Sequence, residues 1–384
     1  MKHRGILLAF ILLTSCSAFA AGVNVEFTAG VGATNNLISD SSNIYDAYSS
    51  ASVNLKAYPL SGLEIGVRGD NTYYRETIGL SSLLGGLKLT YIPIRAKSPL
   101  SIFLSGDVSG RLYHDEFSGF DNNIGEVIGS LGYKLTPHLS ARGGVSFKST
   151  VYVNSAVEYK RDLDFFLGAN TTILGVNSFD LEAGFARTNF THKDNIYFTD
   201  SIPPGWDSPW SYRDWFLEFV GESESNLWVF YCSPRYSRSL GYKTGINLTY
   251  TVQNFQNYHD EIVYGFSTQF LSPWASVWEG QDVTVNLKSY LLPRCILSAG
   301  AGYWDKTYLK TIESRDNFYF QVKERIARQD WQTRIYLGIQ WPLALHSGLL
   351  LEPNATIDYM KNVSNKPLYN FSSFAVSAGI RFRL

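Results

Sequence analysis

The chain of 384 residues is poor in cysteine and methionine, with three Cys and two Met. After the N-terminus, no segment approaches the run of about 18 apolar residues that a membrane-spanning helix requires, and the mean hydropathy is −0.10. These absences exclude a bundle of transmembrane helices. They do not exclude membrane-spanning strands, because a strand crosses a bilayer with about ten residues of alternating character.

The sequence also lacks a charge surplus and any motif of catalysis. Lys and Arg number 33 and Asp and Glu number 34, for a net charge of −1, which argues against nucleic acid as a partner. The six His are scattered, and no H-E-x-x-H, G-x-S-x-G or phosphate-loop motif is present. We therefore expect no enzymatic activity, no catalytic residue, no metal site and no cofactor. A site assembled from distant strands stays open.

The N-terminal 20 residues have the organisation of an export signal. Lys2, His3 and Arg4 form a basic start, residues 6–13 are apolar, and Ala18-Phe19-Ala20 fits a small-x-small cleavage site. We expect residues 1–20 to be a signal peptide and residues 21–384 to form one mature domain. An alternative stays open, because Leu13-Thr14-Ser15-Cys16 resembles a bacterial lipobox, whose cleavage would leave a lipid anchor on Cys16.

Most of the mature sequence alternates between apolar and polar residues with a period of two. This is the pattern of a strand with one apolar face. In the first such segment, Val23, Val25, Phe27, Ala29 and Val31 share one face. No period of 3.6 residues runs far enough to predict a helix of any size. Similar alternation marks segments 51–58, 63–68, 87–91, 101–112, 127–135, 139–148, 179–185, 246–250, 283–288, 297–303, 334–341 and 349–358.

Several features favour a membrane barrel over a soluble β-sandwich. Many of the predicted strands reach ten residues or more, beyond the usual five or six. Short turns at 59–62, 93–99 and 136–138 alternate with longer polar loops at 34–46, 114–123 and 187–209, as periplasmic turns alternate with extracellular loops. The 25 Tyr, 24 Phe and 9 Trp suit aromatic girdles at the two membrane interfaces.

The last segment carries a resemblance to a known group of proteins. Phe374, Phe382 and Leu384 lie on one face of an alternating strand at the C-terminus. This segment is similar to the C-terminal β-signal of bacterial outer-membrane proteins, which the barrel assembly machinery recognises, with Leu384 in place of the usual Phe. The resemblance implies a Gram-negative outer-membrane barrel in contact with membrane lipid and lipopolysaccharide, and an assembly contact through these three residues. It identifies no subfamily.

We therefore expect an all-β fold, a single transmembrane antiparallel up-and-down β-barrel. With both ends on the periplasmic side the strand number is even. We predict about 18 strands, with 16 or 14 also compatible because the region 254–281 is ambiguous. Barrels of 16 to 18 strands typically leave an aqueous channel. In this topology Cys232 and Cys295, which remain after signal removal, lie too far apart for a disulfide.

The polar face of the predicted strands carries charges of both signs. Such a lining shapes the field inside a pore, and its mixed charge argues against strong selectivity for one ion sign. The alternative interpretation is that these residues only fill the lumen as paired ions. The pore-lining candidates are Lys56, Glu64, Arg68, Asp107, Arg111, Lys134, Arg142, Asp180, Glu182, Lys288, Arg334 and Glu352.

A predicted loop at 195–216 is rich in aromatic residues. Because aromatic faces stack on sugar rings, Trp206, Trp210 and Tyr212 are candidates for binding a glycan or lining a constriction, although they equally suit the outer aromatic girdle.

The functional hypothesis from sequence is a porin-like channel for passive diffusion of small polar solutes. The alternative is a barrel with a closed lumen, whose surface loops bind a ligand or partner. A soluble or lipid-anchored β protein is a third interpretation.

Overall fold

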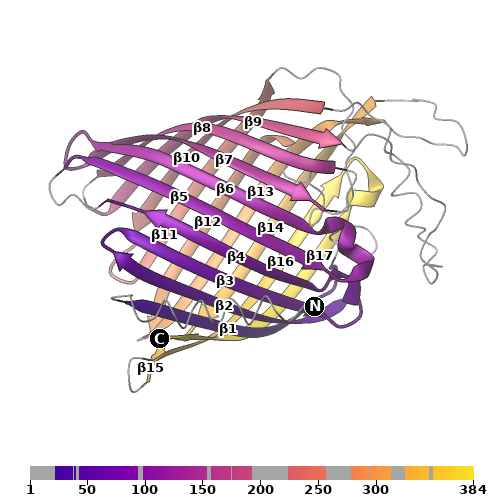
Figure 1. Cartoon of the computed structure of the whole chain (residues 1–384), viewed down its shortest axis with the longest axis horizontal. Coiled ribbons are helices and arrows are strands. Elements are labelled where there is room, and N and C mark those ends of the chain that lie inside the picture. The colour runs from indigo at the N-terminus through magenta and orange to yellow at the C-terminus, as the bar shows by residue number, and fades with distance from the viewer. Residues whose placement is uncertain are drawn as a thin grey trace, which may run out of the picture.

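The computed structural model describes residues 22–37, 39, 43–93, 98–153, 157–173, 175–192, 224–256, 278–292, 294–312, 325–345 and 349–384. The predicted signal peptide with Cys16, and the loop candidates Trp206, Trp210 and Tyr212, lie outside these residues. Sixteen long antiparallel strands form a closed wall, with one short extra strand (Figure 1). The predicted all-β, up-and-down barrel is confirmed.

The strands follow one another around the wall in chain order. Their bounds are β1 (Val23–Thr34), β2 (Asp46–Leu60), β3 (Leu63–Tyr74), β4 (Ser82–Tyr91), β5 (Leu100–Tyr113), β6 (Asn122–Lys134), β7 (Leu139–Tyr152), β8 (Val157–Ile173), β9 (Asn177–His192), β10 (Glu224–Ser239), β11 (Thr244–Gln256), β12 (Trp278–Leu292), β13 (Cys295–Ile312), β14 (Arg325–Gln340), β15 (Leu343–Ala344), β16 (Leu350–Ser364) and β17 (Phe371–Arg383). The short β15 pairs only with the start of β16.

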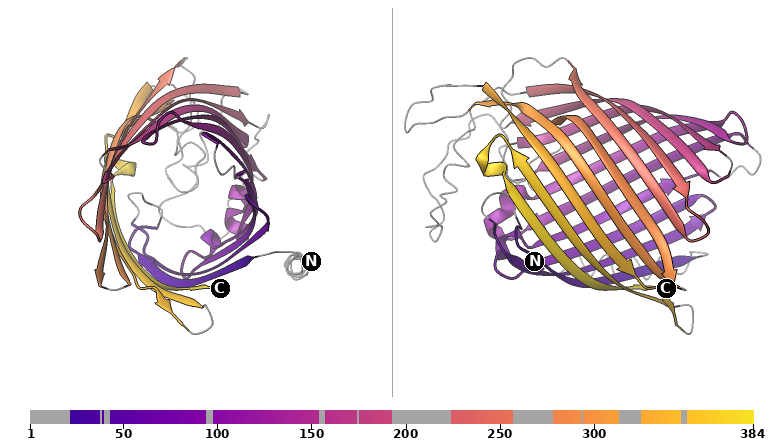
Figure 2. Two further views of the ribbon diagram at one scale, coloured as in Figure 1. Left: turned by 90° about the vertical axis from the view of Figure 1, so that its left-hand side faces the viewer. Right: turned by 180° about the vertical axis from the view of Figure 1, so that it is seen from behind.

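The barrel closes where the first and last strands meet. β1 pairs with β2 on one side and with β17 on the other, both antiparallel. Figure 2 shows the resulting oval ring when the barrel is viewed along its axis. The 16 wall strands fall within the predicted range and below its central value of about 18. Fewer strands fit because some are long, up to the 18 residues of β13.

The two ends of the barrel differ, as predicted. The connections after β2, β4 and β6 lie at one end, called the turn end, and those after β1, β3 and β5 lie at the other, called the loop end. One predicted boundary is wrong. The loop expected from Arg187 begins later, because β9 continues to His192 in register with β8 and β10.

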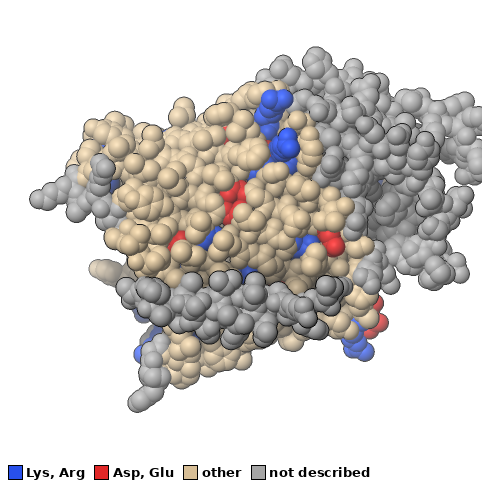
Figure 3. All heavy atoms as spheres, in the orientation of Figure 1, with Lys and Arg blue, Asp and Glu red and all other residues tan. Residues whose placement is uncertain are grey.

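Apolar side chains cover the outside of the wall. Residues opposite one another in a sheet point to the same face, and the register aligns Leu55, Val67, Leu87 and Val108 in one row across β2–β5. Val108 is 64% exposed and Leu167, on β8, is 72% exposed. In Figure 3, uncharged residues make up most of the described part of this face, and Lys, Arg, Asp and Glu atoms show in scattered patches. An apolar outer band is what a bilayer requires of a transmembrane barrel.

Helical structure is confined to short pieces in the described chain. Three 3-10 helices lie at the loop end, η1 (Ile78–Leu80), η2 (Asp115–Phe120) and η4 (Pro367–Tyr369). No helix among the described residues has the length and apolar character needed to cross a membrane. Leu80 of η1 and Phe117 of η2 are buried together and form a small apolar cluster with their neighbours. This cluster packs the loop-end connections against each other.

An ion cluster secures the closing seam on the inner face. Arg381 of β17 lies 3.4 Å from Glu26 of β1 and 3.4 Å from Glu352 of β16. Arg383 pairs with the same two carboxylates, at 3.4 and 3.6 Å. The side chain of Glu352 is 5% exposed. These contacts join the three strands on which closure depends, and closure leaves no strand edge without hydrogen-bond partners.

We predict that Glu352→Gln lowers barrel stability by about 1–2 kcal/mol, because it removes the buried carboxylate while the two partly exposed Arg side chains remain. The readout is the temperature at which the folded, fast-migrating band converts to the unfolded band in gel electrophoresis without boiling.

Glu64→Gln is the matched control for this variant. It breaks the more exposed pair with Lys56, at 2.9 Å, and should cost well under about 1 kcal/mol. Equal melting of the two variants would contradict the role of the seam cluster.

Candidate functional site: the inner wall

The inner face of the wall is polar and carries charges of both signs. One row of residues in register runs Lys88, Asp107, Glu126, Lys148 and Asp162 across β4–β8. These residues alternate along their strands with the exposed apolar residues, so they point to the opposite side, into the lumen. The register places Lys88 opposite Asp107, and Lys148 opposite both Glu126 and Asp162, and such opposite charges stabilise adjacent strands. Asp107 and Glu126 are like charges that face each other across β5 and β6.

Most of the candidates predicted from sequence come together as ion pairs. The shortest described separations are 2.9 Å for Lys56 and Glu64, 3.0 Å for Arg68 and Asp107, and 2.7 Å for Arg142 and Glu182. Asp180 is a second partner of Arg142, at 3.5 Å. Arg334 forms a bidentate pair with Asp358, and Glu352 belongs to the seam cluster. Arg111, Lys134 and Lys288 form no ion pair within the described ranges.

Two of the arginines reach over a glycine on the strand between them and their partner. Arg68 of β3 crosses β4 at Gly86 to reach Asp107 of β5. A Cβ atom at Gly86 would lie 3.0 Å from Nε of Arg68, closer than ordinary contact. The missing side chain therefore lets the guanidinium lie flat along the wall.

The same arrangement recurs on the other side of the barrel. Arg142 of β7 crosses β8 at Gly168, its register partner, to reach Glu182 of β9. A Cβ atom at Gly168 would lie 3.0 Å from Nε of Arg142. Such bridges keep long side chains along the wall instead of across the lumen.

A tyrosine makes a neutral version of this bridge. The hydroxyl of Tyr336 on β14 donates to Oδ1 of Asn286 on β12, at 2.9 Å, across Gly300 of β13. A Cβ atom at Gly300 would collide with the ring of Tyr336. Asn286, Tyr336 and Lys288 line a cavity of about 560 Å³ in this part of the inner wall. Lys288 therefore faces space that a solute can occupy.

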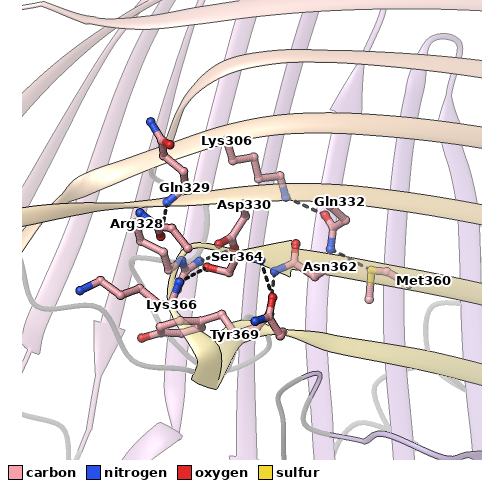
Figure 4. A network of polar contacts seen from close by, with 12 residues as sticks. Lys306, Arg328, Gln329, Asp330, Gln332, Met360, Asn362, Ser364, Lys366 and Tyr369 are labelled. Carbon is pink, nitrogen blue, oxygen red and sulfur yellow. Dashed lines mark hydrogen bonds and ion pairs between the residues drawn. The ribbon is translucent and has the colours of Figure 1, made fainter.

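The sequence analysis missed a polar cluster near the loop end, which we call the Arg328 cluster (Figure 4). The guanidinium of Arg328 lies between the rings of Tyr308 and Tyr369, at 3.6 and 3.9 Å from their centroids, and pairs with Asp330 at 3.2 Å. The ammonium of Lys306 donates to Gln332 at 2.8 Å. The period-two alternation predicted for segment 334–341 continues back through Arg328, Asp330 and Gln332 on β14, and that signal would have assigned these three residues to the lumen face.

The cysteines agree with the predicted topology. Cys232 on β10 and Cys295 at the start of β13 are both free thiols. Within the described ranges, no group of three or more His, Cys, Asp or Glu side chains is placed to hold a metal ion.

The architecture resembles solved barrels, although no family model matches the sequence and no curated protein matches it significantly. CdiB from Acinetobacter baumannii superposes with a TM-score of 0.51 at 11% sequence identity. The superposition covers 94% of this chain and 60% of CdiB. OccAB1 from Acinetobacter baumannii gives 0.49 at 10% identity, over 95% of this chain and 98% of that one. OprD from Pseudomonas aeruginosa gives 0.46 at 9% identity, over 95% and 96%. Of these three structures, only CdiB has a TM-score above 0.5. At 11% identity its similarity supports the barrel fold and nothing more.

We predict opposite solvent access for neighbouring residues on β4. In a background without Cys232 and Cys295, Lys88→Cys on the inner face should react at least about tenfold faster with a charged, water-soluble thiol reagent than Leu89→Cys on the lipid face, because the bilayer excludes the reagent. Labelling of protein reconstituted in vesicles, followed by mass spectrometry, measures both rates. Equal rates would refute the assignment of faces.

Proposed function

We propose that this protein is a channel in the outer membrane of a Gram-negative bacterium, through which small polar solutes diffuse passively. The observation that carries the proposal is the inner wall, where charged side chains lie flat along the strands across Gly86 and Gly168. Because these side chains lie along the wall, the cross-section of the lumen stays open to water and solute. A barrel of 16 strands is also wide enough to enclose an aqueous channel.

The pairing of charges supports a channel with little preference for ion sign. Cations and carboxylates are mixed around the wall, and the candidates from Lys56 to Glu352 are mostly joined in ion pairs. A paired lining presents dipoles more than net charge to the passing solute, so the field along the axis is weak.

The outer face supports a location in the outer membrane and an assembly contact there. We propose that residues 1–20 direct export and that the barrel assembly machinery recognises the outward side chains Phe374, Phe382 and Leu384 of the C-terminal segment. Phe382 packs against Phe27 of β1 with ring centroids 6.2 Å apart. When the barrel closes, β1 would then take the place of the assembly machinery as the partner of this segment.

Single-channel recording of the refolded protein in a planar bilayer tests the channel proposal. We expect discrete conductance steps of nanosiemens order and a reversal potential near zero in a salt gradient, because the lining is charge-balanced. A folded, heat-modifiable protein that conducts nothing would overturn the proposal. It would favour the closed barrel, with ligand binding by the loop residues Trp206, Trp210 and Tyr212.

We predict that Gly168→Leu reduces conductance, because the new side chain displaces the guanidinium of Arg142 from the wall into the lumen. Gly129→Leu is the matched control. Its position points outward, where the nearest atom to an added Cβ is Leu104 Cδ2, at 3.5 Å. The proposal requires a smaller conductance only in the first variant, with both variants retaining heat-modifiable migration.

A further inference from the structure

A row of uncharged polar side chains crosses the inner wall from β9 to β14. These strands lie side by side (Figure 2), and residues opposite one another in register point to the same face. The lumen row through Lys88 and Asp107 on β4 and β5 carries charges, whereas this row aligns hydroxyl and amide groups. Its members are Ser178, Ser237, Asn247, Asn286, Gly300 and Tyr336.

Hydrogen bonds hold the amides of this row along the wall. Nδ2 of Asn247 donates to Oγ of Ser237 at 2.8 Å, and Oγ1 of Thr249 donates to Oδ1 of Asn247 at 3.1 Å. The hydroxyl of Tyr336 donates to Oδ1 of Asn286 at 2.9 Å. An amide carries two N–H donors and an oxygen with two lone pairs, so these contacts leave hydrogen-bonding capacity for a solute in the lumen.

The ring of Tyr336 lies flat against the wall. From β14 the side chain passes over Gly300 of β13, where an added Cβ atom would collide with the ring. The hydroxyl at its far end is anchored to Asn286 of β12. One face of the ring therefore rests on the wall, and the opposite face is turned to the lumen, which agrees with the half-buried state of this residue. Such a face offers an apolar surface for a flat solute.

The cavity of about 560 Å³ beside this row has a mainly uncharged lining. None of the described residues that line it is an Asp or Glu. Lys288 is its lumen-facing cation, and an ammonium group also donates hydrogen bonds to hydroxyl oxygens. Arg238 is among the lining residues as well, but it alternates onto the outer face of β10 with the exposed Tyr236.

The charged groups that flank the row have partners of opposite sign. Asp358 of β16 is the register partner of Tyr336, and Nε of Arg334 donates to both of its carboxylate oxygens. Arg235 and Asp180 are register partners in the next lumen row toward the loop end. The surroundings of Tyr336 therefore suit a neutral solute that exchanges many hydrogen bonds.

We propose that this row is a binding site for a neutral sugar, with a pyranose ring stacked on Tyr336 and its hydroxyls bound by Asn286 and Asn247. A pyranose combines a face of C–H groups with a rim of hydroxyls, which matches an aromatic face beside amides. The cavity lies within the range of about 300–1,000 Å³ that is typical of small-molecule sites. The site rests on the channel proposed above, because it lies on the wall of that lumen, and it names a class of solute for it.

Saturation-transfer NMR of the full chain in detergent tests the site, by titration with glucose and with sorbitol. Sorbitol carries the same kind of hydroxyl groups on an open chain, so it lacks the ring face that stacks on a tyrosine. We expect saturable binding of glucose and at least about fivefold weaker binding of sorbitol. Equal affinity for the two compounds would overturn the proposal.

Two variants should weaken glucose binding and one should largely retain it. Tyr336→Leu removes the stacking face and should cost at least about fivefold in affinity. Gly300→Ala keeps the tyrosine but occupies the place of its ring on the wall, so it should act as the leucine variant does. Tyr336→Phe keeps the ring and loses the hydroxyl contact, so its affinity should stay within about threefold of the unaltered protein.

Phe166→Leu is the matched control, because Phe166 of β8 is also a lumen-facing ring over a glycine, Gly144 of β7. It lies outside the described lining of the cavity, so glucose binding should not change. Unchanged glucose affinity in Tyr336→Leu, or equal weakening by Phe166→Leu, would overturn the proposal. Migration of the unboiled protein reports whether each variant is folded.

Conductance separates this site from the channel itself. A protein that conducts but binds no glucose would overturn the sugar site and leave the channel in place. A folded protein that binds glucose but conducts nothing would support the site and overturn the channel.

Discussion

Every backbone amide in the membrane must find a partner within the protein, and this requirement governs the structure. A sheet meets it only when its first and last strands pair, as β1 and β17 do along most of their length. Closure then divides all side chains between a lipid face and a lumen face. Few apolar side chains are buried in the described part of the chain, and two of them, Leu80 and Phe117, pack the loop-end connections against each other.

The lumen face solves a second physical problem, which is to hold many charges without filling the space. Long side chains cross neighbouring strands where glycine leaves room, as Arg68 does at Gly86 and Arg142 at Gly168. Each bridge satisfies a carboxylate two strands away and adds a cross-strand contact to the backbone ladder. Glycine in these strands costs backbone entropy, which the ion pairs and hydrogen bonds of the wall offset.

On the lipid face, the apolar band of β9 ends at a charged residue, Arg187. The sequence pattern predicted a longer polar loop that begins at Arg187. In the structure β9 continues to His192 in register with β8 and β10, and the guanidinium of Arg187 lies over the ring of Trp228 on β10. A charged side chain at the membrane interface can therefore belong to a strand when an aromatic ring on the neighbouring strand packs against it.

Sequence alone determined the class of fold and the face on which most residues lie, because a period of two assigns each side chain to one side of a strand. It also indicated that Lys56, Arg142 and Glu352 share the lumen face. Only the tertiary structure decided which charges meet. Register and closure depend on the pairing of all strands at once, so the contacts of Arg381 with Glu26, and of Arg142 with Glu182 across β8, have no local signal. The strand number of 16 follows from the same global condition, because a barrel closes only when number, tilt and register agree.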